Sequence, residues 1–300
     1  MKQSIFTGSG TAVVTPFNRE TLDLTALKRM LDFQLEHGTD AIIVCGTTGE
    51  ASTMTYRERM RAIECCVEHI AGRIPVIAGS GSNSTEVAVA LSRDAEHAGA
   101  DGLLVVTPYY NKATQAGLIR HYQVIADAVT KPIILYNVPS RTGVSISPET
   151  CAELARHPNI TGIKEAGSNL SNIQRMRNLC PEDFSIWSGN DDEIAHICLL
   201  GGVGVISVLG NLLPTEIHTL THLCLEKDFA AAAKLQLYLK DICDAMFCEV
   251  NPIPVKTALN LMGMPVGELR LPLCPPQANN LERIRAVLTQ YGLLPSQTIS

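Results

Sequence analysis

One lysine in this sequence differs from the other eight because it stands at the end of an apolar run. Lys164 closes the run 159–164, whereas Lys131 precedes a strand-like run and most of the others fall in helical or loop segments. An unpaired ammonium is costly to bury, and only the neutral amine attacks a carbonyl. Lys164 is therefore predicted either to form a salt bridge with a carboxylate or to act as a Schiff-base nucleophile.

Three other apolar runs end in hydroxyl and cationic side chains. Residues 45–50 read CGTTGE, so Thr47 and Thr48 stand between glycines that give backbone N–H groups access to an anion. Residues 107–111 (TPYYN) contain Tyr110, and residues 136–143 (YNVPSRTG) contain Tyr136 and Arg141. Each feature alone is ordinary: a turn, a packing tyrosine or a solvated arginine. Together with a lysine they predict a pocket with an amine, a carboxylate seat, phenols and a guanidinium.

The elements that must position these side chains follow one rhythm along the chain. Eight short apolar runs alternate with segments of helical periodicity. The predicted strands are 10–14, 40–45, 75–79, 102–107, 133–137, 161–164, 184–188 and 203–208. Eight alternations predict a (β/α)₈ TIM barrel, whose active site lies at the carboxyl ends of its strands. An open doubly wound sheet is the alternative, but it usually carries a glycine-rich phosphate loop, and residues 202–207 (GVGVIS) only approach that pattern.

The rhythm stops near residue 225. Segments 229–246, 254–262 and 279–291 are predicted helices, separated by proline-containing loops. We therefore predict a catalytic barrel over 1–225 and a C-terminal helical extension over 226–300 that packs on it.

Composition excludes several classes of function. The 300 residues are 46% hydrophobic and 18% charged, with a net charge of −6, which suits a folded domain and gives no electrostatic reason to bind nucleic acid. Apolar runs are too short to predict a membrane span, and the first residues do not resemble a signal peptide, so a cytoplasmic location is expected. The ten cysteines contain no Cys-x-x-Cys pair, and we expect them to be free thiols, several of them packed as small hydrophobes.

Two further clusters carry weaker signals. His218 and His222 have metal-ligand spacing on a predicted helix, but no third ligand is evident, so we expect solvated histidines and predict no metal site. Asp191, Asp192 and Glu193 stand at a predicted helix start and are expected to cap it.

With these motifs, nearly the whole chain resembles the dihydrodipicolinate synthase family of pyruvate-dependent class I aldolases. The pattern Gly-x-x-Gly-Glu with a lysine on the sixth strand is shared with N-acetylneuraminate lyase and 2-keto-3-deoxygluconate aldolase. Residues 46–50 together with 136–143 are more specific to the synthase. The resemblance implies condensation of pyruvate with L-aspartate-4-semialdehyde in lysine and diaminopimelate biosynthesis. A sugar-acid aldolase is the alternative activity. A non-catalytic binding module is disfavoured, since it has no need of a proton relay.

The resemblance also implies a role for each matching residue. Lys164 would form the Schiff base without an external cofactor, while Tyr136, Thr47 and Tyr110 would relay protons, Tyr110 coming from a neighbouring subunit. Substrate-binding positions would be Thr48, Arg141, Gly189 and Ile206. The implied assembly is a homotetramer built from two tight dimers.

The regulatory site of lysine-sensitive relatives is matched only in part. Ser52, Asn83 and Tyr109 correspond to it, but Tyr56 and Arg59 stand where sensitive bacterial members typically have histidines, and Val87 replaces a glutamate. A bound lysine would lose a carboxylate partner and face a guanidinium. We therefore expect weak or absent inhibition by L-lysine.

Overall fold

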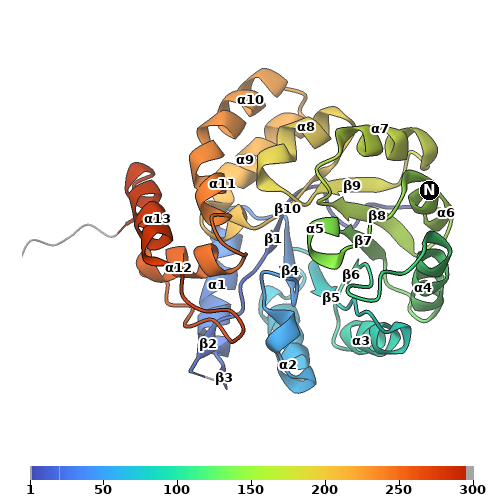
Figure 1. Ribbon diagram of the computed structural model, residues 1–300, viewed down its shortest axis with the longest axis horizontal. Helices are drawn as coiled ribbons and strands as arrows, with labels where there is room; N and C mark the ends of the chain where they lie inside the picture. The colour runs from blue at the N-terminus through green and yellow to red at the C-terminus, as the bar shows by residue number, and fades with distance from the viewer. Residues whose placement is uncertain (1, 20, 295–300) are drawn as a thin grey trace, which may run out of the picture.

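Eight parallel strands close into a barrel in the computed structural model, which describes residues 2–19 and 21–294 (Figure 1). Closure is complete because β1 pairs with both β10 and β4, which excludes the open sheet. The barrel strands are β1 (Gly8–Ala12), β4 (Ala41–Val44), β5 (Val76–Gly79), β6 (Gly102–Val106), β7 (Ile133–Asn137), β8 (Ile160–Glu165), β9 (Ser185–Ser188) and β10 (Gly204–Ser207). A small hairpin, β2 (Phe17–Asn18) and β3 (Thr21–Leu22), follows β1. The prediction of a (β/α)₈ barrel is confirmed.

Two of the predicted strands differ from the observed ones in an informative way. The first strand begins at Gly8, two residues earlier than predicted, and Val14 lies beyond it with its N–H bonded to the side chain of Asn211. The sixth barrel strand extends one residue further than predicted, to Glu165, which pairs with Asn137. Lys164 is thus the penultimate residue of its strand.

Helices alternate with the strands and surround the barrel (Figure 1). They are α1 (Leu24–Glu36), α2 (Tyr56–Ile70), α3 (Thr85–His97), α4 (Gln115–Asp127), α5 (Pro139–Thr142), α6 (Pro148–Leu154), α7 (Leu170–Leu179), α8 (Ile194–Leu199) and α9 (Pro214–Leu225), with 3₁₀ turns η1 (Ala51–Thr53), η2 (Asp191–Glu193) and η3 (Leu209–Asn211). Polar caps define many of their starts. The Thr55 side chain, for example, accepts a hydrogen bond from the Glu58 N–H, and the Glu58 carboxylate accepts one from the Thr55 N–H.

The C-terminal segment is helical, as predicted, with one more break than expected. The predicted helix 229–246 is divided at Leu239 into α10 (Phe229–Tyr238) and α11 (Lys240–Met246). The C-terminal segment continues with α12 (Ile253–Leu261) and α13 (Ala278–Gln290). The last six residues of the proposed extension, 295–300, lie outside the described residues. Apolar side chains of the extension share one core cluster with α8 and α9. No helix in the described ranges has the length and apolar character needed to cross a membrane.

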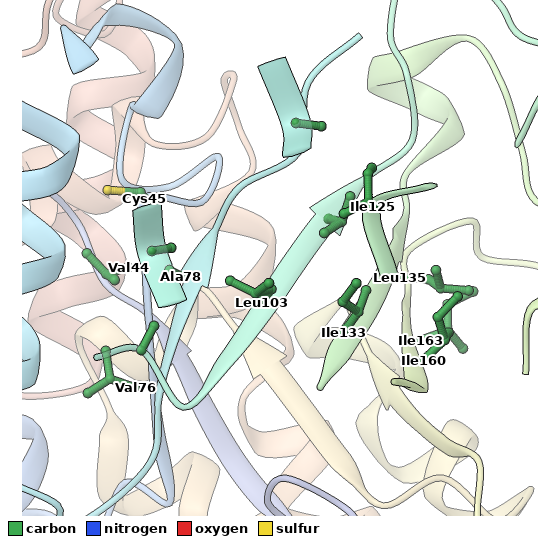
Figure 2. Packing of buried hydrophobic residues seen from close by; sticks show 14 of the residues in the cluster. Val44, Cys45, Val76, Ala78, Leu103, Ile125, Ile133, Leu135, Ile160 and Ile163 are labelled. Carbon is green, nitrogen blue, oxygen red and sulfur yellow. The ribbon is translucent and has the colours of Figure 1, made fainter. Parts of the chain in front are cut away.

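Strand residues alternate between two cores. Ile42 and Val44 join the large cluster between barrel and helices, part of which Figure 2 shows, whereas Ile43 points into the barrel interior. Successive side chains of a strand face opposite sides, so a residue's position in the strand decides which core it enters. The barrel interior also contains Trp187, stacked on Phe6 with ring centroids 5.0 Å apart.

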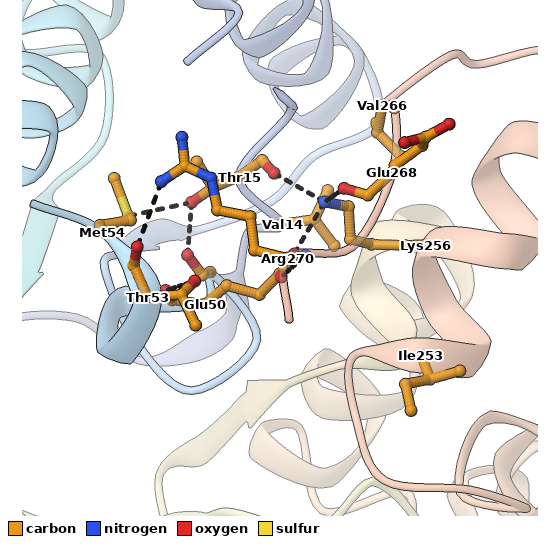
Figure 3. Close-up of polar contacts among 12 residues, drawn as sticks. Val14, Thr15, Glu50, Thr53, Met54, Ile253, Lys256, Val266, Glu268 and Arg270 are labelled. Atoms are coloured by element: carbon orange, nitrogen blue, oxygen red, sulfur yellow. Dashed lines mark hydrogen bonds and ion pairs between the residues drawn. The ribbon is translucent and has the colours of Figure 1, made fainter. Parts of the chain in front are cut away.

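A buried ion pair joins the C-terminal segment to the turn after β4 (Figure 3). Lys256 on α12 donates to Glu50 Oε1 at 2.7 Å and to the carbonyls of Thr15 and Glu268 at 3.1 and 2.8 Å. The other oxygen of Glu50 accepts the backbone N–H of Arg270 at 3.0 Å. Glu50 has φ 52°, a left-handed conformation that a non-glycine residue keeps only when its surroundings hold it.

Removing one member of this pair should strongly destabilise the protein. Lys256→Met leaves Glu50 as a buried, uncompensated carboxylate, and we expect a loss of about 3–5 kcal/mol in the free energy of unfolding, measured by urea denaturation. The double variant with Glu50→Gln should recover part of that loss. Arg61→Ala, which breaks the exposed Arg61–Glu64 pair, should cost no more than about 0.5 kcal/mol. An equal cost for Lys256→Met and Arg61→Ala would contradict this account.

Candidate active site

Lys164 lies inside the barrel in one row with two aromatic residues. The register pairs Tyr136 with Lys164 and Lys164 with Trp187, so the three side chains share the inner face. The Lys164 Nζ lies 4.6 Å from the centroid of the Tyr136 ring, and Lys164 is only 5% exposed. Among the described residues no carboxylate oxygen lies within 4.0 Å of this amine, so the salt-bridge interpretation of Lys164 is wrong. A primary amine in a protected cavity can attack a carbonyl compound that enters it.

A cavity of about 180 Å³ opens above this row, at the carboxyl ends of the strands. Its lining includes five residues singled out from the sequence, namely Thr47, Thr48, Tyr136, Arg141 and Gly189, together with Lys164. A Cβ on Gly189 would stand 2.7 Å from the Ala166 Cβ and 3.1 Å from Lys164 Cε. The missing side chain at 189 therefore leaves the space that the lysine occupies.

Thr48 is tied to a residue that sequence reasoning missed. Asn251 Nδ2 donates to Thr48 Oγ1 at 3.0 Å, and the Asn251 carbonyl accepts from Arg141 Nη2 at 3.3 Å. The Oδ1 atom of Asn251 is buried without a hydrogen-bond partner within the described structure. Asn251 stands in the sequence Asn-Pro-Ile-Pro and precedes the cis peptide bond to Pro252. The local sequence indicates only a loop between helices. Arg141 itself is exposed on the short helix α5.

The chain brings together two of the three predicted relay residues. Thr47 and Tyr136 line the same cavity, but Tyr110 lies on the loop after β6, 90% exposed and with φ 73°. Ile206 is fully buried in the barrel interior and paired with Gly10, and Val208, two residues on, is the member of that segment that lines the cavity.

A second cavity of about 350 Å³ adjoins the first and shares Thr47, Tyr136 and Arg141 with it. Ser52 and Tyr109 line this second cavity, and Asn83 Nδ2 donates to the Tyr109 carbonyl at 3.2 Å. Arg59 also lines it, with Nη2 donating to the Gly79 carbonyl at 2.8 Å. The three predicted regulatory positions therefore gather at one place. Cys45, at its wall, is a buried free thiol whose pKa burial raises to about 12.

Asp191 does not cap the helix that follows it, so the expectation for this residue is wrong. Its carboxylate accepts Ser207 Oγ at 2.5 Å and the N–H groups of Val208 and Leu209 at 3.0 and 2.9 Å. Burial raises the pKa of Asp191, and these hydrogen bonds and the charge of Lys164 oppose the rise. The carboxylate thus orders the end of β10 beside the cavity. The three-residue acidic pattern gave no indication of which of its members turns inward.

Glu165, the residue after Lys164, points to the opposite side of the strand. Its carboxylate accepts Asn137 Nδ2 at 3.0 and 2.9 Å and the Gly167 N–H at 2.6 Å. Burial raises the pKa of Glu165 to about 7 despite these hydrogen bonds. This contact joins the carboxyl ends of β7 and β8, the strands that carry Tyr136 and Lys164.

The fold and the site define a barrel enzyme of the class I aldolase type, a lyase, with a buried lysine amine on a barrel strand. The chain belongs to the dihydrodipicolinate synthetase family, whose model matches residues 5–291. Among curated relatives, the 4-hydroxy-tetrahydrodipicolinate synthase of Caldicellulosiruptor bescii is 54% identical over 97% of this chain and 98% of its own length.

Solved structures agree with this assignment. The dihydrodipicolinate synthase of Thermotoga maritima matches with a TM-score of 0.95 and 45% identity, covering 97% of this chain and 100% of its own. A monomeric dihydrodipicolinate synthase variant matches equally well, with a TM-score of 0.95 and 46% identity over 97% of this chain and 98% of its own. The family resemblance noted in the sequence is confirmed.

The raised pKa of Glu165 predicts a pH-dependent stability. The folded protein holds the proton up to about pH 7, whereas the unfolded chain releases it near the ordinary value of 4.5. Below pH 4.5 the protonated Glu165 therefore makes its full contribution to the free energy of unfolding. That contribution, about 3 kcal/mol, is lost as the pH rises through 7. In urea denaturation, the free energy of unfolding of Glu165→Gln should increase relative to that of the parent protein between pH 5 and pH 8. Glu182→Gln, at an exposed glutamate, is the control, and a pH-independent difference for Glu165→Gln would contradict the assignment.

Proposed function

We propose that this protein is a 4-hydroxy-tetrahydrodipicolinate synthase, condensing pyruvate with L-aspartate-4-semialdehyde through a Schiff base on Lys164. The observation that carries the proposal is the buried Lys164 amine, 4.6 Å from the Tyr136 ring, in a cavity that also contains Thr47, Thr48 and Arg141. Membership of the family and the names of its relatives support the same reaction.

In the first step the Lys164 amine adds to the pyruvate ketone and water leaves. The resulting iminium is an electron sink that acidifies the pyruvate methyl group, so loss of a proton gives an enamine. The enamine carbon attacks the aldehyde, forming the new carbon–carbon bond. The amino group of the second substrate then displaces Lys164 as the ring closes. These steps need no external cofactor and no metal ion.

Thr48 is suited to seat the pyruvate carboxylate. Because Asn251 Nδ2 donates to its Oγ1, the Thr48 hydroxyl proton is free to donate to an anion. Gly189, which lines the cavity, and the main chain of Ile206 on β10 complete the proposed pyruvate site. Arg141 donates to the Asn251 carbonyl through Nη2. Its remaining guanidinium N–H groups can donate to the carboxylate of the semialdehyde.

Proton transfer requires a residue that a single chain does not supply. Thr47 can donate and accept at once, which suits it to link the Tyr136 phenol to a second phenol. Tyr110 is 90% exposed, beside Tyr109, which is 41% exposed, so we propose that it completes the relay of a neighbouring subunit. The proposed assembly is a homotetramer of two tight dimers.

Borohydride trapping tests the chemistry directly. Incubation with pyruvate and borohydride should fix one pyruvate-derived adduct per chain on Lys164, located by peptide mass spectrometry. Lys164→Ala should abolish the adduct and lower turnover in a coupled assay by on the order of 10³-fold or more.

A matched variant separates binding from proton transfer. Tyr110→Phe should still trap pyruvate but turn over about 10²-fold more slowly, as expected for loss of a proton-relay group. Trapping on a different lysine would refute the Schiff-base assignment. A full adduct on Lys164 combined with faster cleavage of N-acetylneuraminate or 2-keto-3-deoxygluconate would instead identify a sugar-acid aldolase.

We further propose that L-lysine inhibits this enzyme weakly or not at all. In the second cavity, Ser52, Asn83 and Tyr109 stand at the matching regulatory positions, but Arg59 contributes a guanidinium. One like charge 4 Å from a bound ammonium costs about 4 kcal/mol at an effective dielectric of 20, before solvent screening. Val87 is 47% exposed and offers no carboxylate to offset it.

Initial rates measured against L-lysine check this expectation. Half-inhibition should require more than about 1 mM lysine, a binding free energy weaker than about −4 kcal/mol. The double variant Arg59→His, Val87→Glu removes the like charge and restores a carboxylate, so it should become more sensitive. Half-inhibition of the parent enzyme below 1 mM would overturn the proposal.

A further inference from the structure

Two histidines on α9 meet a carboxylate at the end of the barrel opposite to Lys164. Asp40 immediately precedes β4, and His218 and His222 stand one turn apart on the helix that packs on β1. His218 Nδ1 lies 3.1 Å and His222 Nε2 lies 3.3 Å from Asp40 Oδ2, and the two imidazole ring centroids are 4.0 Å apart. The sequence indicated no third side chain for the histidine pair, whereas the structure places the Asp40 carboxylate beside both imidazoles.

The donor atoms already have the spacing of ligands that share one ion. Nitrogen and oxygen ligands of Zn²⁺ stand about 2.0–2.1 Å from the metal, so two of them at tetrahedral or octahedral angles are about 2.8–3.4 Å apart. The two measured nitrogen–oxygen separations fall within that interval, and all three donor atoms lie within 4.8 Å of one another. Among the described residues, this is the one group of three or more His, Cys, Asp or Glu side chains with such spacing.

The carboxylate is also held by Ser9 of β1. Asp40 Oδ2 accepts the Ser9 backbone N–H at 2.7 Å and the Ser9 hydroxyl at 3.0 Å. Such outer hydrogen bonds orient the ligating groups of protein metal sites. The other histidine–aspartate pairs among the residues that the structure describes lack this arrangement. In the His69–Asp32 pair, a single imidazole meets a carboxylate that is 52% exposed, whereas Asp40 is 22% exposed.

Space beside the three donors is kept open by a glycine. A Cβ on Gly8 would stand 2.3 Å from Asp40 Oδ2 and 3.1 Å from His222 Nε2, and the φ of +93° independently favours glycine there. The side chains of His218 and His222 are 32% and 39% exposed, so an ion and its remaining water ligands can reach the site.

We propose that Asp40, His218 and His222 form a binding site for a divalent transition-metal ion of the Zn²⁺ type. Two neutral imidazoles and one carboxylate match the ligand preference of zinc and leave further positions to water. The ion would connect the start of β4, and through Ser9 the strand β1, to α9. It would act as a structural clamp, separate from the proposed chemistry at the other end of the barrel.

Metal binding to the full-length, chelator-treated protein tests this site. Equilibrium dialysis with Zn²⁺ alone should show one ion per chain, and Zn²⁺ should raise the melting temperature. His222→Gln should weaken binding at least tenfold and remove the thermal shift, while His69→Gln, at the two-residue pair, should change neither. Ser9→Ala should weaken binding by about 10–100-fold, as expected for loss of an outer hydrogen bond.

Two controls keep the outcome interpretable. Pyruvate trapping on Lys164 by His222→Gln would show that this variant is folded, since its substitution lies at the opposite end of the barrel. Co²⁺ substitution should give a spectrum without thiolate-to-metal charge transfer. The proposal is refuted by absence of Zn²⁺ binding, by binding that both histidine variants retain equally, or by a thiolate spectrum that assigns the ion to cysteine.

Discussion

The turn after β4 depends on a charged side chain, Glu50, that is buried in the protein interior. Glu50 ends the segment that carries Thr47 and Thr48, and it adopts a left-handed conformation. Burying an unpaired carboxylate there would cost several kcal/mol of folding free energy. The Glu50 carboxylate is therefore stabilised by Lys256 and by the Arg270 backbone N–H, both from the C-terminal extension. Arg270 also donates to Glu58 and to the Thr53 carbonyl on the same side of the turn. The extension therefore lines the cavity through Asn251 and supports the turn, although none of its described residues belongs to a strand of the barrel.

The same dependence continues from the extension into the cavity. The loop that precedes α12 places Asn251 against Thr48 and Arg141, so one segment connects two groups proposed to hold different carboxylates. The buried ion pair and the asparagine therefore position the turn from two sides. Without these contacts, the turn that carries Thr47 and Thr48 would lose its hydrogen-bonding partners from the C-terminal extension.

The two ends of the barrel use polar side chains differently. At the carboxyl ends of the strands, side chains such as Lys164 and Thr47 surround a cavity that can accept a small molecule. At the amino ends, Asp40 and two histidines stand at ligand spacing and connect β4 to α9. Parallel strands separate the two ends physically, so a clamp at one end can stabilise the barrel without entering the proposed reaction.

The sequence by itself determined the barrel, the strands that carry or precede the proposed catalytic residues, and the family. These features are encoded within short segments, as the spacing of apolar residues and as local motifs. Lys164 and Tyr136 could be placed together since parallel strands end at one face. The tertiary structure decided what depends on residues far apart in the chain. The partner of Glu50 lies 206 residues away, the partner of Thr48 lies 203 away, and Asp40 is separated from His218 by 178. No local pattern records such distances, because closure of the barrel and docking of the extension bring these groups together.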